Sequence, residues 1–224
     1  MILPEKNMSS ILKAKKEIIE IGRRMYAKGY VVASEGNMSI RIGNKQILVT
    51  PSGKNKGLLK EKDLVVVDLE GKKLTGPQNP NSENLKPSSE LLMHLYVYQK
   101  RKDVNAVVHA HPPYSLAFAS AHLPLAQNLL PEVIMFLGEI PLAAYATPST
   151  EEVPKSLSSF IEKHNTFLLE NHGVLTLGKD IDEAYSRLEM VEHLAKVNLL
   201  CRILGKTEEL SKESLDKLEK LKRI

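Results

Sequence analysis

Hydrophobic positions along the chain recur with two different periods, which together predict a mixture of helices and strands. Residues 8–28 carry apolar side chains at helical spacing and are followed by Gly29, so they predict a first helix. Four short apolar runs then predict strands. These runs lie at 30–33, 38–42, 46–50 and 64–68.

A polar loop over residues 72–87 leads to a helix of about twelve residues that begins near Ser88-Ser89-Glu90. Asp180 and Glu183 predict a capping box where a later helix begins. Residues 123–147 are apolar and fit either kind of element. The remaining predictions are strands at 104–111, 166–170 and 174–177, and helices at 114–121, 151–164, 181–204 and 211–224.

The order of these elements predicts one domain over residues 1–224, with the segment 211–224 as an amphipathic tail helix. A chain of this length can bury a substantial core without disulfides. Strands and helices mix without a regular β-α-β alternation, and neither a repeat nor a linker divides the chain. We therefore expect a mixed α/β sandwich rather than a doubly wound parallel sheet.

Composition and charge argue against two classes of partner. The chain is 42% hydrophobic and carries a net charge of +4, with lysines interspersed among glutamates. Because it has no basic patch interleaved with aromatic residues, we expect no nucleic-acid partner. It has no apolar stretch of roughly 18 residues and no secretory leader pattern, so we expect no membrane partner. The single Cys201 cannot form an internal disulfide, which suits a cytoplasmic protein.

Two histidines lie one residue apart in "NAVVHAHPPYS", residues 105–115. On a strand, His109 and His111 would share one face at a spacing of roughly 7 Å, close enough to bind one ion. An isolated pair of this kind is also a common incidental feature. His172, in the turn Asn171-His172-Gly173, offers the third ligand that a catalytic zinc site requires. The other four fit helix faces (His94, His193) or helix ends (His122, His164).

Three segments are suited to binding an anion, although each also fits an ordinary turn or helix cap. "SEGNMSIR" (34–41) and "TPSGKNKG" (50–57) are turns whose small residues leave backbone N–H groups accessible. "KPSSELLMHLY" (86–96) places two serines at a helix N-terminus. Glu90 lies in the first turn of that helix, where it is either a favourable charge for the helix dipole or a general acid/base.

These motifs follow one another in a characteristic order. From the N-terminus they are Gly36-Asn37, Thr50-Pro51-Ser52-Gly53, Pro87-Ser88-Ser89-Glu90, His109-Ala110-His111 and Asn171-His172-Gly173. The ordered set, spanning residues 10–204, resembles the class II aldolase/adducin family. Within that family the chain is most similar to the aldolases that act on L-fuculose 1-phosphate.

The resemblance implies a three-layer α/β/α sandwich around a largely antiparallel sheet, assembled as a homotetramer with active sites between subunits. It also implies one Zn²⁺ per subunit and a reaction that cleaves a ketose 1-phosphate to dihydroxyacetone phosphate and a small aldehyde. Glu90 would be the catalytic acid/base. The zinc ligands would be His109, His111 and His172, and the substrate phosphate would be bound by Gly36, Asn37, Ser52, Gly53, Ser88 and Ser89.

The chain departs from the fuculose-phosphate aldolases in two places, so other reactions remain open. Those enzymes have a tyrosine in the segment that matches 128–132 and another in the C-terminal tail, whereas this chain has neither and no tyrosine after Tyr185. A pentulose-5-phosphate 4-epimerase would have aspartate in place of Glu90. A methylthioribulose-1-phosphate dehydratase would share the glutamate and the histidines, and a non-enzymatic adducin-like module would lack the histidines.

Overall fold

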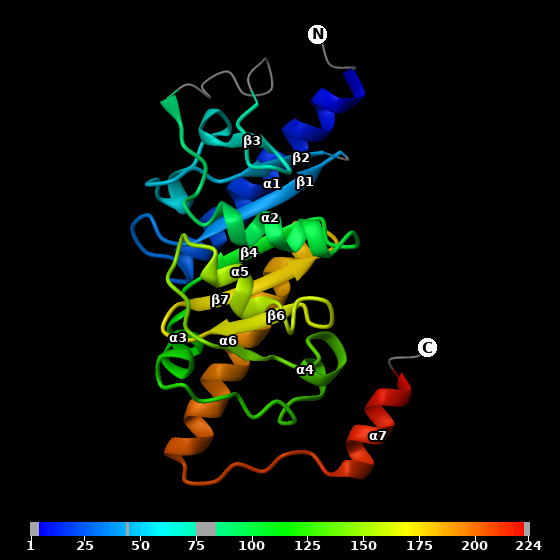
Figure 1. The fold of residues 1–224 in the computed structure, drawn as a ribbon. Coiled ribbons are helices and arrows are strands. Elements are labelled where there is room, and N and C mark those ends of the chain that lie inside the picture. Colours follow the sequence, from blue (N-terminus) through cyan, green and yellow to red (C-terminus); the bar gives the residue numbers. More distant parts are fainter. Residues whose placement is uncertain (1–4, 44, 75–83, 222–224) are drawn as a thin grey trace.

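The computed structural model describes residues 5–43, 45–74 and 84–221. Its helices are α1 (Glu5–Ala27), α2 (Leu91–Lys100), α3 (Pro113–Ser120), α4 (Pro131–Phe136), α5 (Glu152–Leu157), α6 (Ile181–Ile203) and α7 (Lys212–Leu221), with short 3-10 turns η1 (Lys56–Leu58) and η2 (Glu61–Asp63). Its strands are β1 (Asn37–Ile42), β2 (Gln46–Val49), β3 (Val65–Asp68), β4 (Ala106–Ala110), β5 (Leu142–Ala143), β6 (Thr166–Leu169) and β7 (Gly173–Gly178). Figure 1 shows the strands as a central layer between helices.

The strands form one seven-stranded sheet in the order β3-β2-β1-β4-β7-β6-β5. All neighbouring pairs are antiparallel except β5 and β6. The register pairs Asn37 of β1 with His109 of β4, and His109 in turn with Leu175 of β7. Consequently the start of β1, the end of β4 and the start of β7 meet at one edge of the sheet.

Alternating side chains of the strands give the sheet two apolar faces, each covered by helices. In β4, Val108 packs in the core shared with α1, α3, α4 and α6, whereas Val107 packs in the core shared with α2 and α5. This period of two is what a sheet buried on both sides requires. The predicted α/β/α sandwich with a largely antiparallel sheet is therefore confirmed. Among the described residues, no helix has the length and apolar character needed to cross a membrane.

The strand predicted at 30–33 is wrong, because this segment forms a helix cap and a turn instead. The Tyr30 N–H donates to the Met25 carbonyl, and the Glu35 N–H donates to the Val32 carbonyl. Ala33 has a left-handed φ of 47°. A chain that folds back on itself twice within six residues cannot pair as a strand.

Smaller departures concern the ends of elements. The helix predicted at 151–164 ends at Leu157, and the ambiguous stretch 123–147 holds α4 and the two-residue β5. Asp180 caps α6 by accepting from the Glu183 N–H at 2.8 Å, but the Glu183 carboxylate accepts from the N–H of Lys179 at 2.7 Å. In the predicted capping box, Glu183 would accept from the N–H of the N-cap residue Asp180. It accepts from the N–H of the preceding residue instead.

Candidate active site

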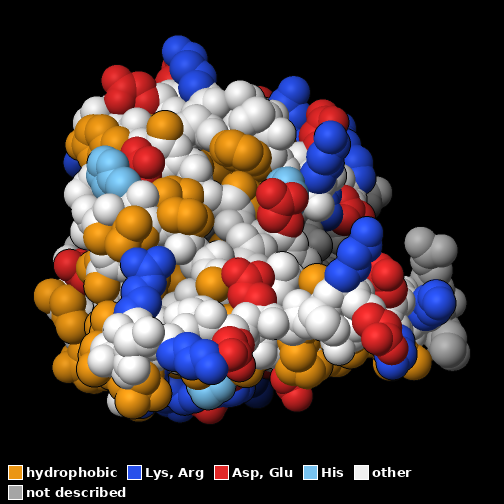
Figure 2. All heavy atoms as spheres, turned by 90° about the horizontal axis from the view of Figure 1, so that it is seen from below, with side chains coloured by type: hydrophobic (Ala, Val, Ile, Leu, Met, Phe, Trp, Pro, Cys, Tyr) orange, Lys and Arg blue, Asp and Glu red, His pale blue; other side chains and the backbone are white. Residues whose placement is uncertain are grey.

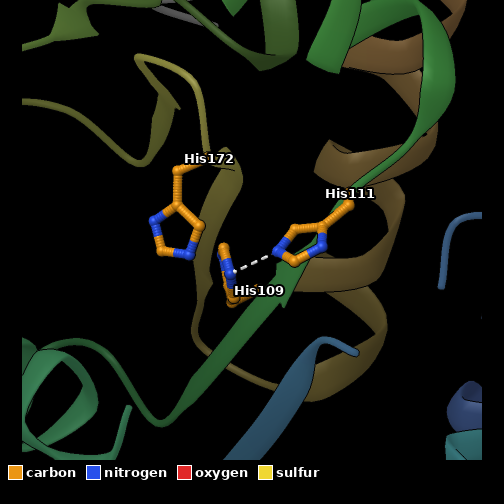
Figure 3. Close-up of side chains that lie close together, drawn as sticks. All are labelled: His109, His111 and His172. Atoms are coloured by element: carbon orange, nitrogen blue, oxygen red, sulfur yellow. Dashed lines mark hydrogen bonds between the residues drawn. The ribbon is translucent and has the colours of Figure 1, made fainter. Parts of the chain in front are cut away.

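His109, His111 and His172 converge at the sheet edge where β1, β4 and β7 meet (Figure 3). His109 lies in β4, His111 follows the end of that strand, and His172 lies in the turn between β6 and β7. Their ring centroids are 4.7–5.5 Å apart. One ring nitrogen from each lies within 4.8 Å of the other two, as a shared metal ion requires.

The turn that carries His172 can approach β4 only because a glycine follows it. A Cβ at Gly173 would lie 2.5 Å from the Ala110 carbonyl oxygen and 2.6 Å from the His111 ring. Asn171, before the histidine, adopts a left-handed φ of 53°, which asparagine tolerates better than most residues. The sequence Asn-His-Gly therefore positions His172 over the end of β4.

The hydrogen bonds of the outer ring nitrogens leave lone pairs pointing to the centre of the triad. His109 Nδ1 donates to the Val174 carbonyl at 2.9 Å, and His111 Nδ1 lies 3.2 Å from the Glu35 carboxylate. In those tautomers the two Nε2 atoms, 3.0 Å apart, both carry lone pairs and repel each other. Protonating one ring would relieve this repulsion, but burial lowers the pKa of both imidazoles and so disfavours protonation.

A divalent cation fits this arrangement, since three neutral imidazoles with an open fourth position form the usual catalytic zinc site. The carboxylate of Glu35 adds the outer hydrogen bond that commonly orients a metal-binding histidine. Glu35 is absent from the residues predicted from sequence, where it has no more signal than any other loop glutamate.

Glu90 lies directly beside the triad, as the N-cap residue of α2. Its Oε1 is 3.0 Å from His172 Nε2, and its Oε2 is 3.3 Å from His109 Nε2. The Asn37 side-chain amide donates to Oε2 at 2.8 Å. Although burial opposes ionisation, the adjacent His109 and His172 and the Asn37 amide hold the pKa of the Glu90 carboxyl below its usual range.

A chain of buried hydrogen bonds extends from Glu90 into the core. Asn37 Oδ1 accepts from His94 Nε2, whose Nδ1 in turn lies 2.7 Å from the Ser39 hydroxyl. The Tyr98 hydroxyl lies 2.8 Å from the same Ser39 oxygen. Burial lowers the pKa of His94 to about 4, so the ring is neutral and can donate at one nitrogen while accepting at the other. Sequence reasoning placed His94 on a helix face, but its position four residues after Glu90 is what brings it to this network.

The predicted phosphate-binding loops lie side by side. A bridge pairs Pro51 with Pro87, the Ser52 N–H donates to the Lys86 carbonyl, and the Ser88 N–H donates to the Thr50 carbonyl. Four of the predicted residues therefore come together here, of which Ser52, Gly53 and Ser89 are exposed and Ser88 is buried.

The other two phosphate candidates lie closer to the histidines. The amide group of Asn37 is committed to Glu90 and His94. Gly36 has a left-handed φ of +66°, and a Cβ there would lie 2.9 Å from the His109 carbonyl oxygen. Gly36 thus allows β1 to start close to β4, whereas the Asn37 side chain joins β1 to α2.

A family model described as "Class II Aldolase and Adducin N-terminal domain" matches residues 16–199. The chain belongs to this class II aldolase and adducin family. An L-fuculose phosphate aldolase of Methanococcus maripaludis is 39% identical over 188 residues, which cover 84% of this chain and 96% of that one. A 3-oxo-tetronate 4-phosphate decarboxylase of Haemophilus influenzae is 33% identical, covering 83% of this chain and 87% of that one.

The solved structures give the same family assignment. A structure of an L-fuculose 1-phosphate aldolase superposes with a TM-score of 0.83 at 29% identity, covering 95% of this chain and 97% of that one. The protein is thus a class II aldolase-family enzyme with a histidine triad suited to a divalent metal. Its relatives include both aldolases and decarboxylases that act on phosphorylated compounds.

Proposed function

We propose that this enzyme is a zinc-dependent aldolase that cleaves a ketose 1-phosphate, such as L-fuculose 1-phosphate, to dihydroxyacetone phosphate and a small aldehyde. The observation that carries the proposal is the Glu90 carboxylate held 3.0–3.3 Å from two nitrogens of the histidine triad. A base beside a Lewis acid is the arrangement that aldol cleavage needs. Zinc is the proposed metal because three imidazoles with an open position typify catalytic zinc.

Aldol cleavage breaks the C3–C4 bond of the ketose. The bonding electrons pass into an enediolate on C2 and C3, while the C4 hydroxyl loses its proton to the Glu90 carboxylate and becomes the aldehyde. A divalent metal bound by His109, His111 and His172 would supply the Lewis acidity that stabilises this negative charge. Glu90 then delivers a proton to C3 to give dihydroxyacetone phosphate, and the Asn37 amide keeps the carboxylate oriented for that transfer.

The substrate phosphate is proposed to bind at the two adjacent loops. Ser52, Gly53 and Ser89 are exposed there, and the two serine hydroxyls and the Gly53 N–H can donate to an anion. Gly36, Asn37 and Ser88 complete the proposed set. Binding the phosphate at a fixed point would bring the C3–C4 bond within reach of the histidine triad and Glu90.

A homotetramer with active sites between subunits is part of the proposal. At the end of the molecule where α6 terminates, Leu200, Ile203 and Leu204 are 48–81% exposed. Figure 2 views the molecule from this end and shows hydrophobic side chains gathered along one margin. Contiguous exposed apolar residues of this kind are typical of surfaces buried by association. Light scattering should therefore give a mass near four times 25.0 kDa.

Decarboxylation is the second candidate, because a decarboxylase relative matches most of the chain. Loss of carbon dioxide from a 3-oxo-tetronate 4-phosphate would leave the same enediolate and, after protonation by Glu90, the same dihydroxyacetone phosphate. The aldolase is favoured because the aldolase relative is 39% identical and the decarboxylase relative 33%.

The two candidates differ in the second product, which decides the experiment. The metal-loaded enzyme is incubated with ketose 1-phosphates, pentulose 5-phosphates, methylthioribulose 1-phosphate and a 3-oxo-tetronate 4-phosphate. We expect equal amounts of dihydroxyacetone phosphate and aldehyde from a ketose 1-phosphate. Carbon dioxide release, a 4-epimer or a dehydrated product in place of the aldehyde would contradict the proposal and identify the alternative reaction.

A further inference from the structure

Lys56 is a buried lysine in the loop between β2 and β3, and it has no role in the proposed mechanism. The residue is 1% exposed. Its Nζ donates to the backbone carbonyls of Ser34 and Lys54, both at 2.7 Å. Ser34 lies two residues before Gly36, and Lys54 directly follows Gly53. One ammonium group thus joins the backbones of two loops that are proposed to bind the substrate phosphate.

Close packing against α1 buries this lysine. A Cβ at Gly22 of α1 would lie 2.4 Å from the Lys56 carbonyl oxygen, and a Cβ at Gly57 would lie 2.7 Å from the Tyr26 side chain. These two glycines allow η1 to lie directly on the helix. The loop is therefore anchored on one side by α1 and on the other by the Lys56 ammonium.

The charge of Lys56 is incompletely balanced. Within the described part of the chain it forms no ion pair with a carboxylate, and burial lowers its pKa to about 8, against the opposing effect of the Glu90 charge. A buried charge without a counter-ion costs free energy. Two of the three ammonium N–H groups donate to the loop carbonyls, so one remains for a further acceptor. A phosphate dianion would supply both the acceptor and the counter-charge.

We propose that Lys56 is the cationic group of the phosphate site, holding the two loops together and selecting a phosphorylated substrate over the free sugar. The inference rests on the proposed function, because it takes these loops as the phosphate-binding loops. Lys56 would bind the substrate without taking part in the reaction, since the proposed chemistry occurs at the histidine triad and Glu90. Its loss should weaken binding of the phosphate far more than it slows turnover.

The test measures the binding of inorganic phosphate to the metal-loaded protein by titration calorimetry. Lys56→Met removes the charge and the hydrogen bonds, whereas Lys56→Gln keeps a donor for the loop carbonyls and removes only the charge. Both variants should raise the Kd for phosphate by about 10- to 100-fold, the scale expected for hydrogen bonds to a charged group. KM for the substrate should rise in parallel while kcat changes by less than about threefold. The matched control Lys62→Met removes an exposed lysine of the neighbouring η2 and should stay within about twofold.

Wild-type affinity for phosphate in a folded, metal-loaded Lys56→Gln variant would overturn the inference. Hydrogen bonds that hold the two loops together would then be enough for phosphate binding, without the positive charge. Failure of the wild-type protein to bind phosphate would overturn it as well. If Lys56→Met does not fold, Lys56→Gln alone decides. Binding of phosphate that depends on Lys56, in an enzyme that cleaves no ketose phosphate, would refute the proposed function and leave this inference standing.

Discussion

His109 and His111 are oriented by different partners. A backbone carbonyl of β7 fixes His109, so its orientation depends only on the sheet. His111 is oriented by the Glu35 carboxylate, which is 44% exposed and belongs to a loop. The two inner nitrogens nevertheless face each other at 3.0 Å. Replacing any ligand of such a triad leaves two, which rarely hold a catalytic metal.

Alanine at His109, His111 or His172 should therefore remove most of the bound metal, as measured by elemental analysis of the purified protein. The control is His193→Ala, an exposed histidine of α6. Full metal content in one of the three variants would exclude that residue from the ligand set.

His94 is a poor control for metal binding, because it supports the residue that orients Glu90. His94→Leu would leave Asn37 without its buried partner, at a cost of about 1–3 kcal/mol in unfolding free energy. We expect metal content to stay at the wild-type level while kcat falls roughly tenfold, less than the roughly 10²- to 10⁴-fold that complete loss of acid/base catalysis would cost. Unchanged kcat in a folded variant would show that Asn37 holds Glu90 without help.

Among the elements, the loop over residues 30–36 shows where sequence patterns succeed and fail. Tyr30 to Ala33 has the apolar, β-branched character of a strand, yet the cap after α1 and the left-handed Ala33 turn it away from the sheet. By contrast, β1, β2 and β3 follow their patterns because both faces of the sheet are buried.

The convergence of His109, His111 and His172 could be predicted from sequence, because histidine has few other reasons to recur at a strand end and a tight turn. Glu35, His94 and Ser39 could not be predicted, because what gives them their role is contact across strands and helices. Asn37 was predicted as a phosphate ligand, and the hydrogen bond from its amide to Glu90 could not be predicted either. The positions of these residues in the sequence do not indicate such contacts.

Gly36 provides a test of how closely this loop must approach β4. Gly36→Ala would add a methyl group 2.5 Å from Val31 Cγ1 and 2.9 Å from the His109 carbonyl, at a φ of +66°. Gly43 has the same φ of +66° with nothing within 4 Å of its Cβ position, so Gly43→Ala is a matched control for backbone strain alone. Both should lose about 1–2 kcal/mol of unfolding free energy in urea from the left-handed conformation. Gly36→Ala should lose a further 1–3 kcal/mol, roughly, from overpacking. Equal losses would mean that the loop can move away from β4 without cost.

On the scale of the whole molecule, α7 extends from the body and packs against α4 (Figure 1). The preceding segment is fixed by a hydrogen bond from the Leu210 N–H to the Asn128 carbonyl. Leu215 and Leu218 are partly buried, which agrees with the apolar edge predicted for the tail.

A chain that ends at residue 210 should therefore lose stability, because α4 would be uncovered. We expect the Tm to fall by a few degrees, the scale of about 1 kcal/mol in a protein of this size, with a loss of activity. Calorimetry, a turnover assay and light scattering on the same sample test this. A truncated protein with full activity, unchanged Tm and unchanged mass would show that α7 contributes nothing to the enzyme.

The most direct test of the proposed chemistry is Glu90→Gln, with metal content and turnover measured on the same preparation. Glutamine keeps the shape of the side chain and removes its charge and basicity. Because the proposal gives the metal three histidine ligands, occupancy should stay near the wild-type level. On the substrate found by the product assay, kcat should fall by about 10²- to 10⁴-fold with a much smaller change in KM. Wild-type turnover would contradict the role of Glu90 as the acid/base, and loss of the metal along with activity would make it a fourth ligand instead.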